Sequence, residues 1–280
     1  MDRQKRRWKR GALVLTAGAA LCAGAVWALQ DGLAVTRYDF PLPVGLEGLN
    51  GLTIAQISDV HSADIQQKLE AALQAAAPDL IVMTGYLVNR EDRDLSCALS
   101  LAAMAVKIAA VYYAPGNHEA DNHCYPELRE GLSEAGVTVL EDASAQLLWA
   151  GETVNMIGMR DLMFSPQGRE AAREQLPQAI RSLCQAGALN VVLSHRPSLM
   201  AEYARSGAHL VFSGHAHGGQ VRLQLVGPLF APDDGALPDY TAGMYQAGDT
   251  QVVVSRGLGN GTPFPRLWNP PELVVVTCIS

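Results

Sequence analysis

From Gly51 onward the chain alternates short apolar runs with longer segments in which apolar residues recur at helical spacing. A short apolar run that ends in polar or glycine residues is typical of a buried strand, whereas an Ala/Leu-rich segment stopped by Pro is typical of a helix. On these criteria the sequence predicts strands at 52–57, 80–83 and 108–113, separated by helices at 68–77 and 94–106.

The second half of the chain continues this alternation. Strands are predicted at 153–159, 190–193, 210–212, 252–254 and 273–277, with one long helix at 169–185. Strands that alternate with helices of this length imply right-handed crossovers and a largely parallel sheet in an α/β domain. The simplest organisation is one domain at 48–280, which a linker at 31–47 joins to an N-terminal segment at 1–30.

The N-terminal segment has the charge pattern of a membrane-targeting sequence. Residues 1–10 contain six basic residues and one acid, and residues 11–29 are uncharged and rich in Ala, Leu, Val and Gly. Such a stretch is about long enough to cross a bilayer, and the basic residues before it predict a cytoplasmic N-terminus with the domain outside. Three interpretations remain open: an uncleaved single-pass anchor, a signal peptide cleaved near Ala25 or Ala28 that leaves an exported protein, and a buried helix.

Composition excludes some classes of protein. The 280-residue chain is 49% apolar, which suits a sizeable core, and its net charge of −7 argues against a nucleic-acid partner. The five cysteines are scattered, and none form a Cys-X-X-Cys pair. Such a set argues against a disulfide framework and against a zinc site built from cysteines, so a metal site would need other ligands.

Potential metal ligands follow the predicted strands. These residues are Asp59 and His61, the run Asn117-His118-Glu119, His195, and the pair His215 and His217. Sites in parallel α/β sheets lie at the carboxyl ends of the strands, so these side chains should meet. Five of the seven histidines lie at such ends, whereas His123 and His209 do not. Imidazole with oxygen ligands is typical of a divalent-metal site.

The same residues form motifs that resemble those of the calcineurin-like metallophosphoesterases. The motifs are Asp59-Val60-His61, Gly116-Asn117-His118-Glu119, the lone His195, and Gly214-His215-Ala216-His217. The resemblance covers nearly all of 51–280 and looks closest to the membrane-associated bacterial branch, in which Gly-Gly-Gln follows the histidine pair and a Ser-Arg-Gly-Leu-Gly stretch comes later. Here these are residues 218–220 and 255–259. The resemblance implies a four-layer α/β/β/α sandwich.

The resemblance also implies two divalent ions, of Mn, Fe, Zn or Co, held in one bowl. Asp59, His61 and His217 would bind the first ion. Asn117, His195 and His215 would bind the second. Two such ions polarise phosphoryl oxygens and generate hydroxide from a bridging water. His118 would stabilise the transition state or protonate the leaving oxygen, with Glu119 orienting its ring, and Arg256 would contact a phosphate.

One motif departs from the family pattern. In place of Gly-Asp-X-X-Asp this chain has Gly85-Tyr86-Leu87-Val88-Asn89, so Tyr86 stands at the position of the metal-bridging aspartate and Asn89 at that of the second acid. Three interpretations remain open. A single ion could support a slower phosphoesterase, Tyr86 could ligate as a phenolate, or the site could bind a phosphorylated ligand without turning it over.

These features predict a metal-dependent phosphoesterase at the outer face of the cytoplasmic membrane. Its substrate would contain a phosphomonoester, phosphodiester or pyrophosphate bond, in a phosphorylated small molecule or a lipid head group. The N-terminal segment would connect it to the membrane. The rival function is that of a non-catalytic protein that binds a metal or a phospho-ligand on a degraded phosphoesterase scaffold.

Overall fold

Two six-stranded sheets form the centre of the computed structural model, which describes Gly18, Cys22, Gly24 and residues 32–223, 225–232, 235–262 and 265–280. The first sheet has the strand order β1-β16-β2-β3-β4-β5. Its strands are β1 Ala34–Pro41, β2 Thr53–Ile57, β3 Leu80–Thr84, β4 Ala110–Ala114, β5 Thr138–Val139 and β16 Glu272–Ile279. The second sheet has the order β14-β15-β9-β8-β7-β6. Its strands are β6 Ala143–Trp149, β7 Glu152–Gly158, β8 Leu189–Leu193, β9 Leu210–Ser213, β14 Gly243–Ala247 and β15 Thr250–Val254.

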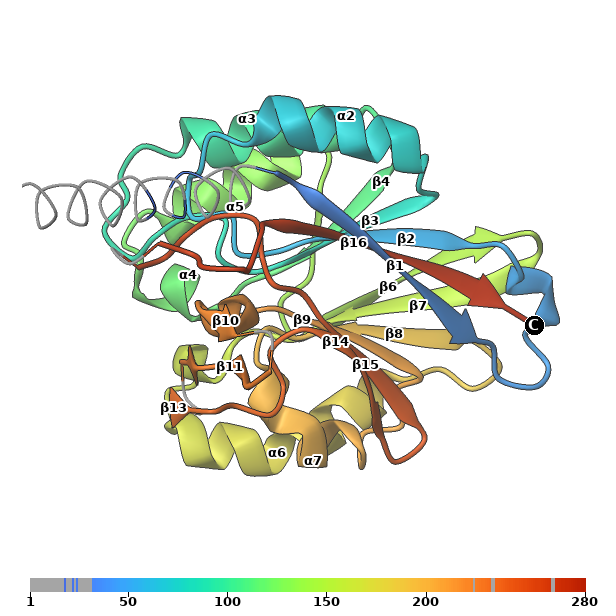
Figure 1. Cartoon of the computed structure of the whole chain (residues 1–280). Helices are drawn as coiled ribbons and strands as arrows, with labels where there is room; N and C mark the ends of the chain where they lie inside the picture. The colour runs from blue at the N-terminus through green and yellow to red at the C-terminus, as the bar shows by residue number, and fades with distance from the viewer. Residues whose placement is uncertain are drawn as a thin grey trace, which may run out of the picture.

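Helices cover the outer face of each sheet, which gives four layers (Figure 1). Helices α2 (Gln66–Ala76), α3 (Ser96–Ala105) and α5 (Tyr125–Glu134) pack on the first sheet, and α6 (Arg169–Leu183) and α7 (Met200–Tyr203) on the second. One apolar cluster lies between the two sheets, and one more lies under the helices on each side. The α/β/β/α sandwich expected from the sequence is confirmed.

The central strands are apolar on both faces because both faces are covered. All five residues of β3 and of β8 are buried, as is usual for parallel strands between two layers. β2, β3 and β4 run parallel to one another in the first sheet, and β7, β8 and β9 do so in the second. This arrangement brings together the loops that follow these strands.

Shorter elements occupy the loops around that edge. They are the helix α4 Asn117–Asp121, the 3-10 turns η1 Glu47–Leu49, η2 Leu162–Phe164, η3 Pro197–Leu199 and η4 His217–Gly219, and the short strands β10 Arg222–Leu223, β11 Gly227–Pro228, β12 Phe230–Ala231 and β13 Gly235–Ala236. The four short strands form two hairpins, β10 with β11 and β12 with β13.

Every strand and helix that the apolar pattern predicts is present, but the linker assigned to 31–47 is partly wrong. Ala34–Pro41 form β1, an edge strand that pairs in parallel with β16. Exposed and half-buried residues alternate along β1, and only Phe40 is buried, so no apolar run marks it. The apolar pattern does not predict β6 for the same reason, because its burial alternates from Ala143 to Trp149.

The predicted membrane segment at 11–29 lies outside the described residues except at Gly18, Cys22 and Gly24. Within the described part of the chain, no helix combines the length and the apolar character that a membrane span requires. The five cysteines are free thiols.

Gln56 connects the two sheets close to the edge where the loops gather. Its side chain is fully buried, and its amide group donates hydrogen bonds of 2.9 Å to Thr84 Oγ1 and 2.8 Å to the carbonyl oxygen of Ser213. Thr84 ends β3 of the first sheet, and Ser213 ends β9 of the second. One side chain therefore fixes the separation of two strands whose following loops carry candidate ligands.

Gln56→Ala should lower the free energy of unfolding by about 2–4 kcal/mol, because it leaves a cavity and two buried groups without their donor. Denaturant unfolding followed by circular dichroism measures this loss. The control Gln67→Ala, at an exposed position on α2, should stay within about 0.5 kcal/mol of the original chain. Equal stability of the two variants would contradict the role given to Gln56.

Candidate metal centre

The loops that follow five strands carry the residues predicted from the sequence. They are Asp59 and His61 after β2, Tyr86 after β3, Asn117 and His118 after β4, His195 after β8, and His215 and His217 after β9. These loops surround a cavity of about 390 Å³. Of the predicted residues, His61, Tyr86, Asn117, His118, His215 and His217 line it.

The backbone of these loops adopts an unusual conformation. Asp59, His61, Tyr86, His215 and His217 all have positive φ values, between 48° and 66°. Left-handed backbone is disfavoured for residues with a Cβ atom, and it clusters at functional sites where the surrounding structure enforces it. The strain therefore marks this edge as the functional part of the fold.

The carboxylate of Asp59 lies fully buried between the two sheets. Its Oδ1 accepts a 2.9 Å hydrogen bond from the backbone N–H of His215, and its Oδ2 accepts one of 2.5 Å from Ser58 Oγ. A Cβ atom on Gly214 or Gly257 would collide with this side chain. These two glycines therefore allow the second sheet and the C-terminal loop to close around the carboxylate.

Three candidate ligand atoms converge, one from each of Asp59, His61 and His217. Nε2 of His61 lies 3.2 Å from Nε2 of His217, which lies 3.8 Å from Oδ1 of Asp59. Single donor atoms of the three residues all fall within 4.8 Å of one another. Ligands bound at about 2.0–2.2 Å lie at comparable distances from each other, so this donor set fits one divalent ion.

Asn89 orients the ring of His61. Its Nδ2 donates to the carbonyl oxygen of His61 at 3.2 Å and to Asp92 Oδ2 at 3.0 Å, which fixes the amide so that Oδ1 faces Nδ1 of His61 at 2.8 Å. Nδ1 must therefore donate, and Nε2 presents its lone pair to the centre. The position of the family's second acid thus keeps an orienting role, as residues behind metal ligands commonly do.

Arg266 is a buried cation that the sequence analysis did not single out. Its guanidinium donates to the carbonyl oxygens of Gly259 and Arg256, and its Nη2 lies 3.3 Å from Nδ1 of His217. A guanidinium only donates, so Nδ1 of His217 accepts and Nε2–H points at His61. An ion that binds here would displace this proton. No sequence motif marks Arg266, because its role follows from the way the C-terminal loop folds back.

Burial sets the protonation of the three candidate ligands. It lowers the pKa of His61 to about 4 and that of His217 well below its usual value, so both rings are neutral at physiological pH. Burial also raises the pKa of Asp59 to about 7, despite hydrogen bonds from Ser58 and His215 that lower it. Neutral His61 presents a lone pair to the centre, whereas His217 must first give up its Nε2 proton and Asp59 its carboxyl proton before they can ligate.

The residues that the resemblance assigns to a second ion do not fit one in this structure. The Tyr86 hydroxyl lies 2.8 Å from Oδ1 of Asn117 and 2.9 Å from Nδ1 of His215. Burial raises the pKa of this phenol, with Asp59 adding to the effect, so the hydroxyl stays protonated in the metal-free protein. His195 donates from Nδ1 to the carbonyl oxygen of Thr84 at 2.7 Å, and its Nε2 is buried without a partner in the described structure.

His118 lines the cavity, but Glu119 does not orient its ring as expected. The carboxylate of Glu119 instead accepts three backbone hydrogen bonds, from Tyr86 at 3.0 Å, Leu87 at 2.8 Å and Gly116 at 2.9 Å. These bonds join the loop after β3 to the loop after β4 and satisfy donors that would otherwise be buried and unpaired. The ring of His118 packs on that of Tyr86, with centroids 3.9 Å apart.

The structure places Arg256 away from the cavity. Its guanidinium forms a 2.7 Å ion pair with the buried carboxylate of Glu272, at the start of β16. Three other arginines line the cavity: Arg90, Arg169 and Arg196. Arg90 and Arg196 directly follow the motif residues Asn89 and His195, a proximity that could have identified them from the sequence.

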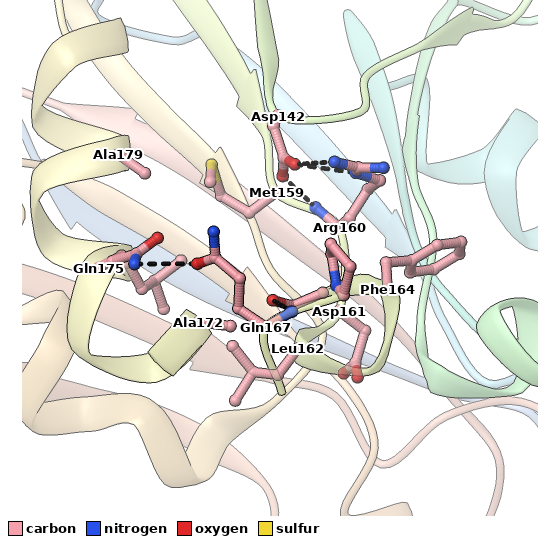
Figure 2. A pocket seen from close by; sticks show the side chains of 13 residues that line it. Asp142, Met159, Arg160, Asp161, Leu162, Phe164, Gln167, Ala172, Gln175 and Ala179 are labelled. Carbon is pink, nitrogen blue, oxygen red and sulfur yellow. Dashed lines mark hydrogen bonds and ion pairs between the residues drawn. The ribbon is translucent and has the colours of Figure 1, made fainter. Parts of the chain in front are cut away.

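A second pocket, of about 280 Å³, lies between α6 and the segment after β7 (Figure 2). Its wall includes the Asp142–Arg160 ion pair and a 3.2 Å hydrogen bond from Gln175 to Gln167. Its described lining contains no histidine. Asp161 lies at its edge and forms hydrogen bonds of 2.7 and 3.0 Å with Arg196. The Asp161–Arg196 pair therefore lies between the two cavities, and this second pocket carries none of the candidate ligands.

Comparison with known proteins agrees with this geometry. The sequence profile of the calcineurin-like phosphoesterase family matches residues 52–219, more than half of the chain. The chain therefore belongs to this family. The uncharacterized metallophosphoesterase YkuE of Bacillus subtilis is 27% identical to it, over 99% of this chain and 98% of that protein.

Two further relatives have named activities. Phosphodiesterase YaeI of Escherichia coli is 27% identical, over 74% of this chain and 70% of that protein. The UDP-2,3-diacylglucosamine pyrophosphatase LpxG of Chlamydia muridarum is 24% identical, over 88% of this chain and 89% of that protein. Among solved structures, the NAD nucleotidase NadN of Haemophilus influenzae superposes with a TM-score of 0.50 at 16% identity, over 74% of this chain and 45% of that one, which supports the fold alone.

Metal affinity should depend on pH through Asp59. A cation competes with the proton on this carboxylate, whose pKa in the metal-free protein is about 7. The apparent affinity for Mn²⁺ should therefore fall about tenfold for each pH unit below 7 and level off above pH 8. Calorimetric titration of the full chain from pH 5.5 to 8.5 tests this. An affinity that does not change between pH 5.5 and 7.5 would show that no proton on Asp59 competes with the ion in this range.

Proposed function

We propose that this protein is a metal-dependent hydrolase of phosphodiester or pyrophosphate bonds that acts at the outer face of the cytoplasmic membrane. The observation that carries the proposal is the convergence of Asp59, His61 and His217 on one point beside a cavity large enough for a phosphate group. Membership of the calcineurin-like phosphoesterase family supports the same reaction type.

These three residues would hold one divalent ion. When bound, such an ion polarises a phosphoryl oxygen and lowers the pKa of a bound water towards neutrality. The protein's own contribution is to present the three donors from rigid strand ends, with His61 fixed by Asn89. Donors on rigid strand ends need little movement when the ion and the substrate arrive.

His118 would contribute a hydrogen bond to the phosphoryl group. Burial lowers the pKa of its ring to about 3, so the imidazole is neutral at physiological pH. A neutral ring can donate an N–H to a phosphoryl oxygen as negative charge develops there, and it is a poor proton donor to a leaving group. Of the two roles that the family resemblance leaves open, we therefore favour stabilisation of the transition state.

The arginines around the cavity favour an anionic substrate. Arg90, Arg169 and Arg196 line the cavity, where Arg90 is paired with Asp121 and Arg196 with Asp161. The named activities of the Escherichia coli and Chlamydia muridarum relatives, a phosphodiesterase and a UDP-2,3-diacylglucosamine pyrophosphatase, support a phosphodiester or pyrophosphate bond as the target. A rival function as a non-catalytic binding protein gains support from Tyr86, which replaces an aspartate at the centre of the cavity.

The membrane location rests on residues 11–29 and on the direction of β1. β16 runs antiparallel to β2, and β1 runs parallel to β16. β1 therefore begins at the edge where β2 ends, close to Asp59. An anchor that precedes β1 by a few residues would hold this edge near the bilayer, and the cavity would open towards the membrane surface.

Exposed apolar side chains at the same edge support this orientation. They are Leu225, Val226, Phe230, Leu237 and Trp268, each at least 42% exposed. They belong to the two small hairpins and the segment beside them, where Val221 pairs with Leu267. The hairpins follow η4, which contains His217, and Pro232 lines the cavity. An apolar rim around a polar cavity suits a substrate that lies in a bilayer.

Hydrolysis should require a divalent ion held by the three converging residues. The full chain in detergent should no longer hydrolyse bis(p-nitrophenyl) phosphate after a chelator has removed its metal. Addition of Mn²⁺ should restore this activity. Asp59→Asn and His217→Ala should lower both bound metal and turnover by about 100-fold or more. The control His123→Ala, at an exposed histidine, should change neither. If the chain binds metal but turns over neither diester nor pyrophosphate substrates, the hydrolase function is refuted and the function as a non-catalytic binding protein is supported.

The apolar rim should matter only for substrates in a bilayer. In full-chain protein reconstituted into phosphatidylglycerol vesicles, the double variant Leu225→Asp/Val226→Asp should hydrolyse a bilayer-embedded phosphodiester about five- to tenfold more slowly. Its rate on the soluble diester should not change.

The matched control is Leu148→Asp. Leu148 is 74% exposed, but it lies near the end of β6, which pairs with the beginning of β7 and so lies at the opposite edge of the sheet. This variant should keep both rates. Equal losses at the two edges would remove the support for the orientation.

A further inference from the structure

The side chain of Tyr86 fills the middle of the candidate metal centre. It is 3% exposed, and its ring centroid lies 3.9 Å from that of His118, 4.1 Å from that of His195 and 4.7 Å from that of His61. Its hydroxyl reaches past these rings to Asn117 and His215. The phenol therefore touches residues of both predicted ligand sets.

The hydroxyl uses the donor atoms that a second cation would need. Oδ1 of Asn117 only accepts, so the phenolic O–H donates to it at 2.8 Å. The hydroxyl oxygen then accepts from Nδ1–H of His215 at 2.9 Å. A cation requires lone pairs from both atoms. The lone pair of Oδ1 of Asn117 is already engaged by the phenolic O–H, and Nδ1 of His215 carries a proton.

His195 retains a mark of the missing ion. Its Nδ1 donates to Thr84, which leaves the lone pair of Nε2 directed away from that bond. This Nε2 is buried, and it has no hydrogen-bond partner in the described structure. An unpaired buried acceptor costs free energy. The phenol hydrogen-bonds to two residues of the second ligand set, Asn117 and His215, and leaves Nε2 of His195 without a partner in the described structure. One hydroxyl cannot fill the several coordination positions of a cation.

We propose that the Tyr86 hydroxyl takes the place of the second metal ion, so that the centre binds a single ion and residue 86 alone sets this number. The proposal rests on the proposed function only for the first ion, between Asp59, His61 and His217. The remaining residues of the second set, Asn117, His195 and His215, are present and lie against the Tyr86 side chain. The second site is therefore blocked and could be opened by one substitution.

The net charge of such a centre indicates the substrate class. One divalent ion with the single carboxylate of Asp59 leaves less positive charge than two ions would, and the neutral phenol adds none. Electrostatic attraction grows with the charge on the substrate as well as on the site. Compared with a two-ion centre, a one-ion centre therefore loses more electrostatic attraction for a dianionic phosphomonoester than for a monoanionic diester. The chain should accordingly prefer diesters.

Variants at position 86 can separate charge from space. Tyr86 has a φ of 56°, a conformation that Asp and Asn tolerate well, so both replacements suit the backbone. Tyr86→Asp opens the site and supplies a carboxylate, and Tyr86→Asn opens it equally without the charge. Tyr86→Phe keeps the ring and removes only the hydroxyl.

Metal stoichiometry tests the proposal without recourse to activity. Full-chain protein, stripped and dialysed against Mn²⁺, should contain one ion per chain by elemental analysis and give the electron paramagnetic resonance spectrum of isolated Mn²⁺. Tyr86→Asp should bind two ions and give the spectrum of a spin-coupled pair. Tyr86→Phe should stay at one ion, and Tyr86→Asn should bind the second ion at least about tenfold more weakly than Tyr86→Asp.

Two ions in the unaltered chain would overturn the proposal, whatever its turnover. One ion in Tyr86→Asp, with unchanged thermal unfolding, would show that residue 86 does not set the number alone. If Tyr86→Asp fails to fold, a second ion in Tyr86→Asn would support the proposal, and one ion in Tyr86→Asn would count against it. A one-ion protein without turnover would refute the proposed hydrolase and leave this inference intact.

Discussion

The centre depends on the hydrogen bond between the buried carboxylate of Asp59 and the backbone N–H of His215. The carboxylate accepts this bond from the second sheet although its own strand belongs to the first, and glycines on two other loops close around it. A carboxylate in such a position is costly to ionise, which is why its pKa rises. A cation beside it removes that cost. The metal site and the junction of the two sheets are therefore stabilised by the same event.

Much of the remaining architecture holds neighbouring loops in strained conformations. Glu119 ties the loop after β3 to the loop after β4 through three backbone hydrogen bonds, and Gln56 sets the spacing of the two sheets just below. His195 packs against Gly85 and Gly116, where any side chain would collide with its ring. The left-handed residues persist because these contacts leave them no alternative.

The covered strands could be predicted well from the sequence, because a short apolar run bounded by polar residues is typical of a strand that is buried on both faces. β3 and β8 are buried along their whole length. β1 could not be predicted, since its exposed residues give no apolar run, and the roles expected of Glu119 and Arg256 were wrong because their partners are backbone atoms or lie far away in sequence. The convergence of Asp59, His61 and His217 follows from strand ends and family motifs. The hydroxyl contacts of Tyr86 do not, because the reach of a side chain cannot be inferred from spacing.

The position of β16 gives the centre an order of assembly. This strand, the last along the chain, lies between β1 and β2, and its first residue, Glu272, donates a backbone hydrogen bond to Gly257, which packs against Asp59. Pairings between residues so distant in sequence form late, because closing a long loop costs entropy before the contacts compensate for it. A nascent chain would thus possess all three candidate ligands long before it could hold them together. The three candidate ligands are therefore brought together only once β16 has joined the first sheet.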